Sequence, residues 1–152
     1  MSEAPGTGGT PRVDFYLVDS PEPLARLRTT CRLVEKARDQ GLRSTVRAAS
    51  TSEAAQFDEL LWTFAELAFI PHAVWPQDAA AAIDAPVLVT AGPLPDSHRD
   101  VLLNLGLDVP TGFTGYARVL EIIGPGEDER RAGRARWRAY RDAGIEPASH
   151  TV

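Results

Sequence analysis

The chain has 152 residues, of which 43% are hydrophobic and 24% charged, and its net charge at pH 7 is −5. These values predict one folded domain and exclude a disordered chain or a basic protein that coats DNA. The single cysteine, Cys31, excludes an intrachain disulfide and argues against a cysteine-based zinc site. No apolar run is long enough to cross a membrane, and the N-terminus lacks a signal-peptide pattern, so we expect a cytoplasmic protein.

The first half of the chain alternates between strand-like and helix-like segments after a tail rich in glycine, proline and threonine, residues 1–11. The predicted elements are a strand over 13–18, a helix over 24–40 with Gly41 as its C-terminal cap, a strand over 43–48, and a helix that begins with a capping box of Ser50 and Glu53. This order is typical of an α/β sheet with right-handed crossovers.

The second half contains shorter apolar segments and then a basic helix. These are an irregular strand edge or tight connection around Pro71, a strand over 86–90, a short apolar segment over 101–105, a strand over 119–123 and a helix over 130–141. We expect the α/β domain to cover residues 12–146. Residues 147–152 have no strand or helix pattern and are predicted to form a loose C-terminal tail.

The segment 130–141 holds six arginines and no acid, so the rest of the chain carries a charge of −11. On a helix, Arg130, Arg134, Trp137 and Arg141 share one face. Guanidinium groups one turn apart, followed by an indole ring, can bind carboxylates and an apolar group together. The alternative is a solvated helix whose arginines pair with the acids at positions 127–129.

Sequence motifs for catalysis or for phosphate binding are absent. The chain has no glycine-rich loop between a strand and a helix, no nucleophile elbow and no pair of histidines at metal-ligand spacing. Cys31 lies on an apolar helix face, where a core residue is the better interpretation than a catalytic thiol. These observations predict a binding module without a cofactor or a metal rather than an enzyme.

Seven stretches together resemble the chi subunit of bacterial DNA polymerase III holoenzyme, over about residues 13–146. They are VDFYL (13–17), LVEKA (33–37), FDELLW (57–62), FIPH (69–72), PVLV (86–89), DVLLNL (100–105) and RARWRAYRDAG (134–144). The resemblance implies a Rossmann-like, three-layer α/β domain that has a mainly parallel central sheet, a C-terminal arginine-rich helix and no nucleotide site. It also implies a non-catalytic adaptor of the clamp-loader assembly in DNA replication.

Two partners follow from the resemblance, the psi subunit and the acidic C-terminal tail of single-stranded-DNA-binding protein, which ends in Pro-Phe. The residues that it implies for the tail are Trp62 and Ile123 as an apolar wall, Arg130 and Arg134 for charge, and Trp137 around the phenylalanine. Arg134 is the choice for the terminal carboxylate. Association with the clamp loader and DNA would be indirect, and no membrane contact is expected.

For psi, the candidate residues are Phe69, Ile70, Pro71 and His72, although plain core packing explains them equally well. Two other functions stay open. The chain could be a nucleotide- or nucleic-acid-binding domain, or a small enzyme, on a Rossmann-like fold. It could also be a structural subunit that only holds psi, with the arginine helix merely solvated.

Overall fold

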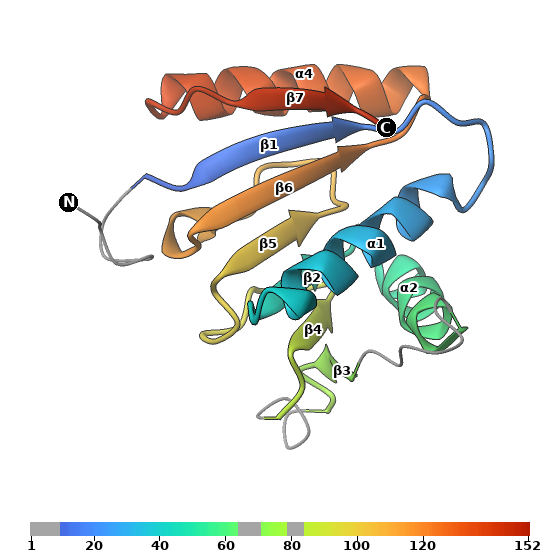
Figure 1. Ribbon diagram of the computed structural model, residues 1–152. Coiled ribbons are helices and arrows are strands. Elements are labelled where there is room, and N and C mark those ends of the chain that lie inside the picture. Colours follow the sequence, from blue (N-terminus) through green and yellow to red (C-terminus); the bar gives the residue numbers. More distant parts are fainter. Residues whose placement is uncertain (1–9, 64–70, 79–83) are drawn as a thin grey trace.

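The computed structural model describes residues 10–63, 71–78 and 84–152, and it shows one sheet flanked by helices (Figure 1). The strands are β1 (Arg12–Leu17), β2 (Ser44–Arg47), β3 (His72–Trp75), β4 (Val87–Thr90), β5 (Val101–Asn104), β6 (Arg118–Ile123) and β7 (Ala148–Thr151). Within the described residues all seven are parallel, in the order β3-β4-β2-β5-β6-β1-β7.

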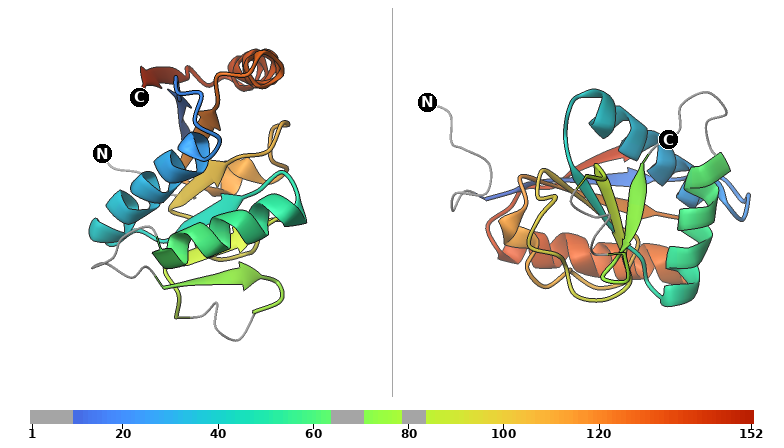
Figure 2. Two further views of the ribbon diagram at one scale, coloured as in Figure 1. Left: turned by 90° about the vertical axis from the view of Figure 1, so that its right-hand side faces the viewer. Right: turned by 90° about the horizontal axis from the view of Figure 1, so that it is seen from below.

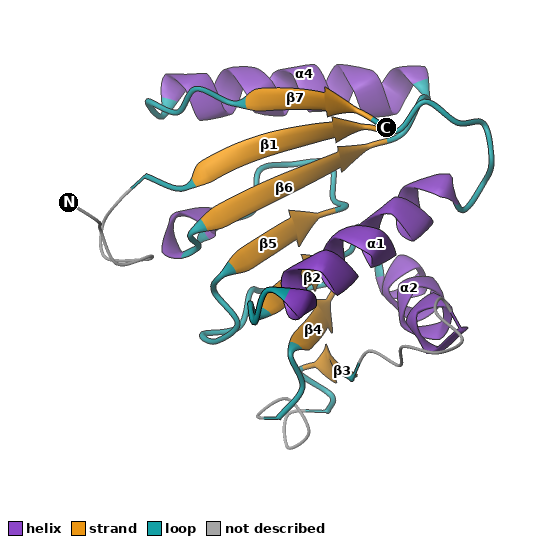
Figure 3. Ribbon diagram, viewed as in Figure 1, coloured by secondary structure: helices purple, strands orange, loops and turns teal. Residues whose placement is uncertain are grey.

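Helices cover both faces of the sheet, as a parallel sheet requires. Helices α1 (Ala25–Asp39) and α2 (Thr51–Thr63) lie on one face, and α4 (Glu127–Asp142) lies on the other (Figures 1 and 2). Figure 3 colours the helices and the strands differently. A short 3₁₀ turn at Phe113–Gly115 precedes β6. The predicted three-layer, Rossmann-like α/β fold is therefore confirmed.

Each face of the sheet has its own apolar core. Phe57 and Leu61 of α2 join Leu27 and Val34 of α1 over the first face. On the second face, Tyr140 of α4 packs with residues from β1, β5 and β6. The inner strand β4 has a nearly continuous apolar sequence, and all four of its residues are buried because both faces of the strand are covered.

The helix boundaries follow local chemistry closely, with one exception. Gly41 has φ +77 directly after the end of α1, which confirms it as a C-terminal cap. The Ser50 Oγ accepts the Glu53 amide at 3.1 Å, as a capping box predicts. The exception is the start of α1, which begins at Ala25 without a side-chain cap.

The C-terminal residues are not loose, so the prediction for 147–152 is corrected. Residues of β7 pair with β1 in parallel register, and the Val152 amide donates to the Leu17 carbonyl at 3.0 Å. The His150 Nε2 also lies 3.0 Å from Oδ1 of the buried Asp14. The sequence gives no sign of this strand because all four of its residues are exposed and no apolar alternation marks it. Backbone hydrogen bonds with β1 hold these C-terminal residues in place instead.

Figures 1 and 2 show α4 lying along the back of the upper strands, with the ends of β1 and β6 close to its first turn. This arrangement brings a helix face, the ends of β1 and β6, and the edge strand β7 together. Among the described helices, none is both long enough and apolar enough to cross a membrane.

Candidate binding site beside helix α4

A pocket of about 240 Å³ lies between α4 and the strands β1, β6 and β7. Its walls are mainly apolar, and two arginines contribute to its lining. The lining residues are Phe15, Leu17, Ile123, Arg130, Gly133, Arg134, Trp137 and Ser149. A pocket of this composition can enclose a small apolar group and bind an anion next to it.

Gly133 explains how α4 approaches β6 closely enough to form this pocket. A Cβ atom at Gly133 would lie 3.0 Å from the Ile123 Cδ1 atom, closer than nearly all real contacts. Glycine weakens an isolated helix by about 1 kcal/mol relative to alanine. Here it removes a side chain at the point where helix and strand touch, so close packing offsets the loss.

The two arginines of the pocket are placed differently. The Arg130 Nη2 atom lies 3.8 Å from Asp19 Oδ1, and its Nε is buried with no hydrogen-bond partner in the described part of the chain. Arg134 is exposed and forms no ion pair or hydrogen bond with a described residue. Arg134 is therefore available to a ligand without first breaking a contact.

Trp137 forms one wall of the pocket. Its ring centroid lies 5.0 Å from that of Phe15, with an interplanar angle of 57°, and the side chain is half-buried. The expected face of α4 is thus confirmed for Arg130, Arg134 and Trp137. Arg141 is not part of the pocket lining, and its Nε lies 3.5 Å from Glu146.

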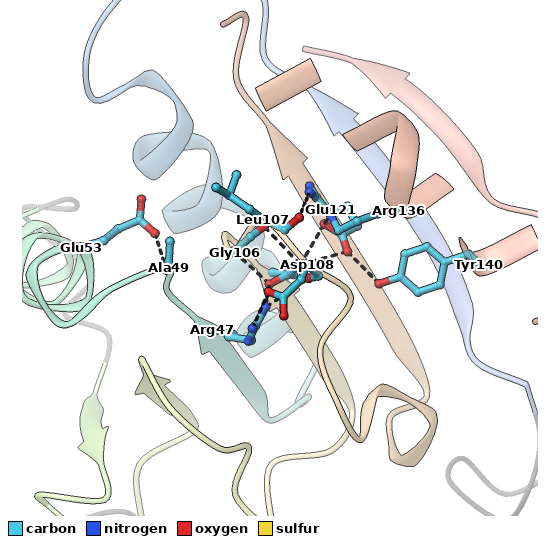
Figure 4. Close-up of polar contacts among 10 residues, drawn as sticks. Arg47, Ala49, Glu53, Gly106, Leu107, Asp108, Glu121, Arg136 and Tyr140 are labelled. Carbon is cyan, nitrogen blue, oxygen red and sulfur yellow. Dashed lines mark hydrogen bonds and ion pairs between the residues drawn. The ribbon is translucent and has the colours of Figure 1, made fainter. Parts of the chain in front are cut away.

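Not all arginines of α4 are surface groups, because Arg136 is 4% exposed. Its Nε donates to Glu121 at 2.8 Å, and its Nη1 donates to the Leu107 carbonyl at 3.0 Å. Glu121 is fully buried and also accepts the Tyr140 hydroxyl at 2.7 Å and the Asn104 side-chain amide at 3.0 Å (Figure 4). The sequence interpretation missed this cluster, which joins α4 to β5 and β6.

The cluster fixes the rotation of α4 about its own axis. Burial raises the pKa of Glu121, while the charge of Arg136 and the hydrogen bonds from Tyr140 and Asn104 oppose that rise. Because Arg136 and Tyr140 are one turn apart on the helix, both of their contacts with Glu121 hold the same helix face against the sheet. The neighbouring face, with Arg134, is then directed to the pocket.

The alternative of a solvated helix predicts that its arginines pair with the acids at 127–129, and among the described residues one such pair occurs. Arg131 pairs with Asp128 at 3.1 Å, and both side chains are largely exposed. The other nearby acid with a contact, Glu129, pairs instead with Arg26 of α1 at 3.3 Å.

Trp62 does not line the pocket. It lies near the end of α2, on the face opposite α4, and is 57% exposed. Its ring lies 5.1 Å from that of His72, whose Nε2 is 2.8 Å from Asp58. Pro71, which precedes His72 in the chain, is exposed. Phe69 and Ile70 fall outside the described residues.

The edge where Rossmann-like proteins bind nucleotides lies at the carboxyl ends of the strands. There, a hollow of about 210 Å³ is lined by residues that follow β2, β5 and β6. Arg26 reaches across it to Glu53 and Glu129. Two carboxylates repel phosphate, and Arg26 is already paired with both of them. In the part of the chain that the structure describes, no group of three potential metal ligands occurs.

Comparison with known proteins decides the family. A family model described as "DNA polymerase III chi subunit, HolC" matches residues 10–148. The chain belongs to the DNA polymerase III chi subunit family. It is 39% identical over 141 residues to DNA polymerase III subunit chi of Pseudomonas aeruginosa, covering 93% of this chain and 96% of that protein. It is 28% identical over 138 residues to DNA polymerase III subunit chi of Escherichia coli, covering 86% and 91%.

Membership in the chi family confirms the resemblance and the prediction of a non-catalytic accessory subunit for DNA replication. The interpretation of Cys31 agrees with the structure, because the side chain is fully buried and burial raises its pKa to about 12. A thiol in that environment is packed in the core and is not a nucleophile.

Proposed function

We propose that this chain is the adaptor of a DNA replicase that binds the acidic C-terminal tail of single-stranded-DNA-binding protein. The observation that carries the proposal is Arg134, an arginine without a described partner beside an apolar pocket. A peptide that ends in phenylalanine offers a ring, a terminal carboxylate and upstream acids. Each of these has a counterpart of the right chemistry in the pocket.

The phenylalanine ring would enter between Trp137 and Ile123, which are already held by the Phe15 contact and by β6. Its carboxylate would accept hydrogen bonds from Arg134, and an upstream acid would meet Arg130. Arg130 would have to exchange a 3.8 Å contact with the exposed Asp19, which is a weak interaction in water. The peptide therefore displaces little when it binds.

Arg134→Ala tests this assignment. Loss of one hydrogen bond to a charged group costs about 1.5–3 kcal/mol, or roughly ten- to hundredfold in affinity. The measurement is fluorescence anisotropy with a labelled peptide that copies the tail. The matched control is Arg131→Ala, which removes the same charge from the same helix at a position outside the pocket. A peptide without its terminal phenylalanine should also fail to bind.

The control decides between a site and a general charge effect. Equal losses in Arg134→Ala and Arg131→Ala would reduce the interaction to nonspecific attraction and would contradict the proposed pocket. Binding of a nucleotide at the carboxyl edge of the sheet, where Arg26 lies, would favour the alternative of a nucleotide-binding domain. A thermal-shift titration with nucleotides tests that alternative.

We also propose that psi docks on the surface around Trp62 and Pro71, which lies over the buried side chain of His72. Support comes from the exposed Trp62, whose ring contacts His72 of the edge strand β3, and from Pro71, which is exposed next to His72 in the chain. Aromatic residues of this kind often anchor protein interfaces. Trp62→Ala should then abolish capture of purified psi in a pull-down and leave tail-peptide binding intact. Arg134→Ala should do the reverse. If Trp62→Ala still captured psi as well as the native chain does, the result would contradict this surface.

A further inference from the structure

The side of the sheet opposite the pocket carries a second basic surface. In Figure 1, α1 passes in front of the lower strands, while β1 and β7 have no described helix in front of them. We call this uncovered area, together with the outer face of α1, the α1 surface. It is formed by Arg12, Tyr16, Arg28, Arg32, Lys36, Arg118 and His150.

Three cations form a row along α1. Arg28, Arg32 and Lys36 follow one another at intervals of four residues, so about 6 Å separates each from the next along the helix axis. All three are exposed, and none has an ion pair or hydrogen bond from its side chain to a described residue. The acids of α1 are Glu35 and Asp39, and Asp39 already pairs with Arg38 at 3.4 Å.

The row continues onto the sheet. Lys36, Tyr16 and Arg118 line one small hollow between α1 and the strands β1 and β6. Arg118 then meets Asp14 at 3.1 Å, where Arg12 also binds at 3.1 Å. Asp14 is fully buried beneath these side chains, so the groups that face solvent are the cations.

An aromatic platform lies within this basic surface. The rings of Tyr16 and His150 stack, with centroids 4.9 Å apart and an interplanar angle of 26°. His150 is exposed, and its Nε2 is fixed by Asp14 at 3.0 Å. A held ring that faces solvent beside a row of cations is the arrangement by which proteins bind single-stranded nucleic acids, with bases on rings and phosphates on cations.

We propose that the α1 surface binds single-stranded nucleic acid directly. The phosphates follow Arg28, Arg32 and Lys36, and an unpaired base stacks on the Tyr16–His150 platform. A duplex fits less well, because its bases are stacked inside and do not reach the rings. The net charge of −5 opposes a polyanion, so the contact is weak, with a dissociation constant of about 10⁻⁴ M, in the range of nonspecific contacts. It adds a direct contact to the indirect association with DNA that the family resemblance implies.

The experiment is fluorescence anisotropy with a labelled oligothymidylate of about 12 nucleotides, between about 50 mM and 200 mM salt. The test variant is Arg32→Glu with Lys36→Glu. The matched control is Arg131→Glu with Arg138→Glu, which changes net charge equally at exposed positions of α4 on the other side of the sheet. The test variant should lose at least about tenfold in affinity, and the control should stay within about twofold.

Salt and base stacking provide two further readouts. With three phosphates neutralised, the logarithm of the association constant should fall with the logarithm of salt concentration with a slope of about −2 in the native chain. This slope should approach zero in the test variant. An abasic oligomer of equal length should bind about fivefold more weakly, because stacking on the rings is lost.

Three results would overturn the proposal. They are no binding of the oligothymidylate at the lowest salt, equal losses in the test and control variants, or equal affinity for the abasic oligomer. None of these results bears on the pocket beside α4, because its tail peptide binds on the opposite face of the sheet.

Discussion

At the scale of single residues, two buried carboxylates organise the polar interior. Glu121 accepts hydrogen bonds from Arg136, Tyr140 and Asn104 (Figure 4). Asp14 accepts them from side chains on β1, β6 and β7. Asp14 thereby connects β1 with β6 and β7, which lie more than a hundred residues later, and Glu121 connects β6 with β5 and α4. Removing one partner of such a pair strongly destabilises the protein, because the remaining charge is then buried without a partner.

Arg136→Leu should lower the free energy of unfolding by about 3–5 kcal/mol at pH 7, because Glu121 is left without its cation. Without Arg136, burial raises the pKa of Glu121 further above its value in the unfolded chain. The variant should therefore recover stability as the pH falls, since the folded state then binds the proton more readily. Urea unfolding at several pH values measures this.

The double variant Glu121→Leu with Arg136→Leu is the control for that experiment. Removing both charges should restore part of the stability lost in Arg136→Leu. A double variant less stable than Arg136→Leu would show that packing, and not the unpaired charge, causes the loss.

Asp14→Asn tests the second carboxylate. Burial by itself would raise the pKa of Asp14, but the hydrogen bonds from His150 and Arg118 and the charge of Arg12 hold it below its usual value. A depressed pKa contributes stability above the unfolded pKa of about 4, and that stability is lost as the pH falls through the folded value. Asp14→Asn should cost about 1–3 kcal/mol at pH 7. The difference from the native chain should shrink below about pH 4 in urea unfolding, and a difference independent of pH would contradict the account.

At the scale of elements, α4 has to meet two structural requirements. Its buried face must pack on β6, where Gly133 allows contact with Ile123. Its neighbouring face must present Arg130, Arg134 and Trp137 to the pocket. Buried residues and pocket-lining residues are interspersed along α4. Rotating the helix about its axis would therefore disturb both its packing and the pocket.

Gly133→Val should therefore lower both stability and tail-peptide affinity. The added side chain would meet Ile123, and overpacking of this kind costs about 1–3 kcal/mol. Ala135→Val is the matched control, because Ala135 is exposed on the same helix and only helix propensity changes, by less than about 1 kcal/mol. Thermal unfolding and peptide anisotropy measure the two effects. Equal behaviour of the two variants would contradict the role given to Gly133.

Most elements could be predicted from the sequence because their signals are local. The cap at Gly41, the capping box at Ser50 and the shared face of Arg130 and Arg134 all depend on residues a few positions apart. Strand β7 could not be predicted, since its order comes from pairing with β1, more than a hundred residues earlier. Arg136 could not be predicted either, because its partner Glu121 lies on another element, and the packing of α4 on the sheet brings the two together.

The placement of Trp62 shows the same limit at the scale of the site. Family resemblance put it in the tail pocket, but the crossover from β2 places α2 on the face opposite α4. Which face a helix covers depends on the path of the whole chain through the sheet. No local pattern around Trp62 contains that information.

At the scale of the whole molecule, the sheet separates surfaces of different chemistry. The pocket beside α4 has apolar walls and two arginines, whereas the α1 surface has a row of cations and stacked rings. At the carboxyl edge, Glu53 and Glu129 oppose nucleotide binding. This layout would allow a chi-family subunit to contact partners on both sides of the sheet at once, as the proposed adaptor function requires.

The most direct test of the central claim is a double-mutant cycle between Arg134 and the carboxylate of the tail peptide. Tail-peptide affinity is measured by anisotropy for the native chain and Arg134→Ala, each with the free-acid peptide and with a peptide amidated at its C-terminus. If Arg134 binds that carboxylate, each single change should cost about 1.5–3 kcal/mol, and the two together should cost little more than either alone. Fully additive losses would contradict the pairing of Arg134 with the terminal carboxylate.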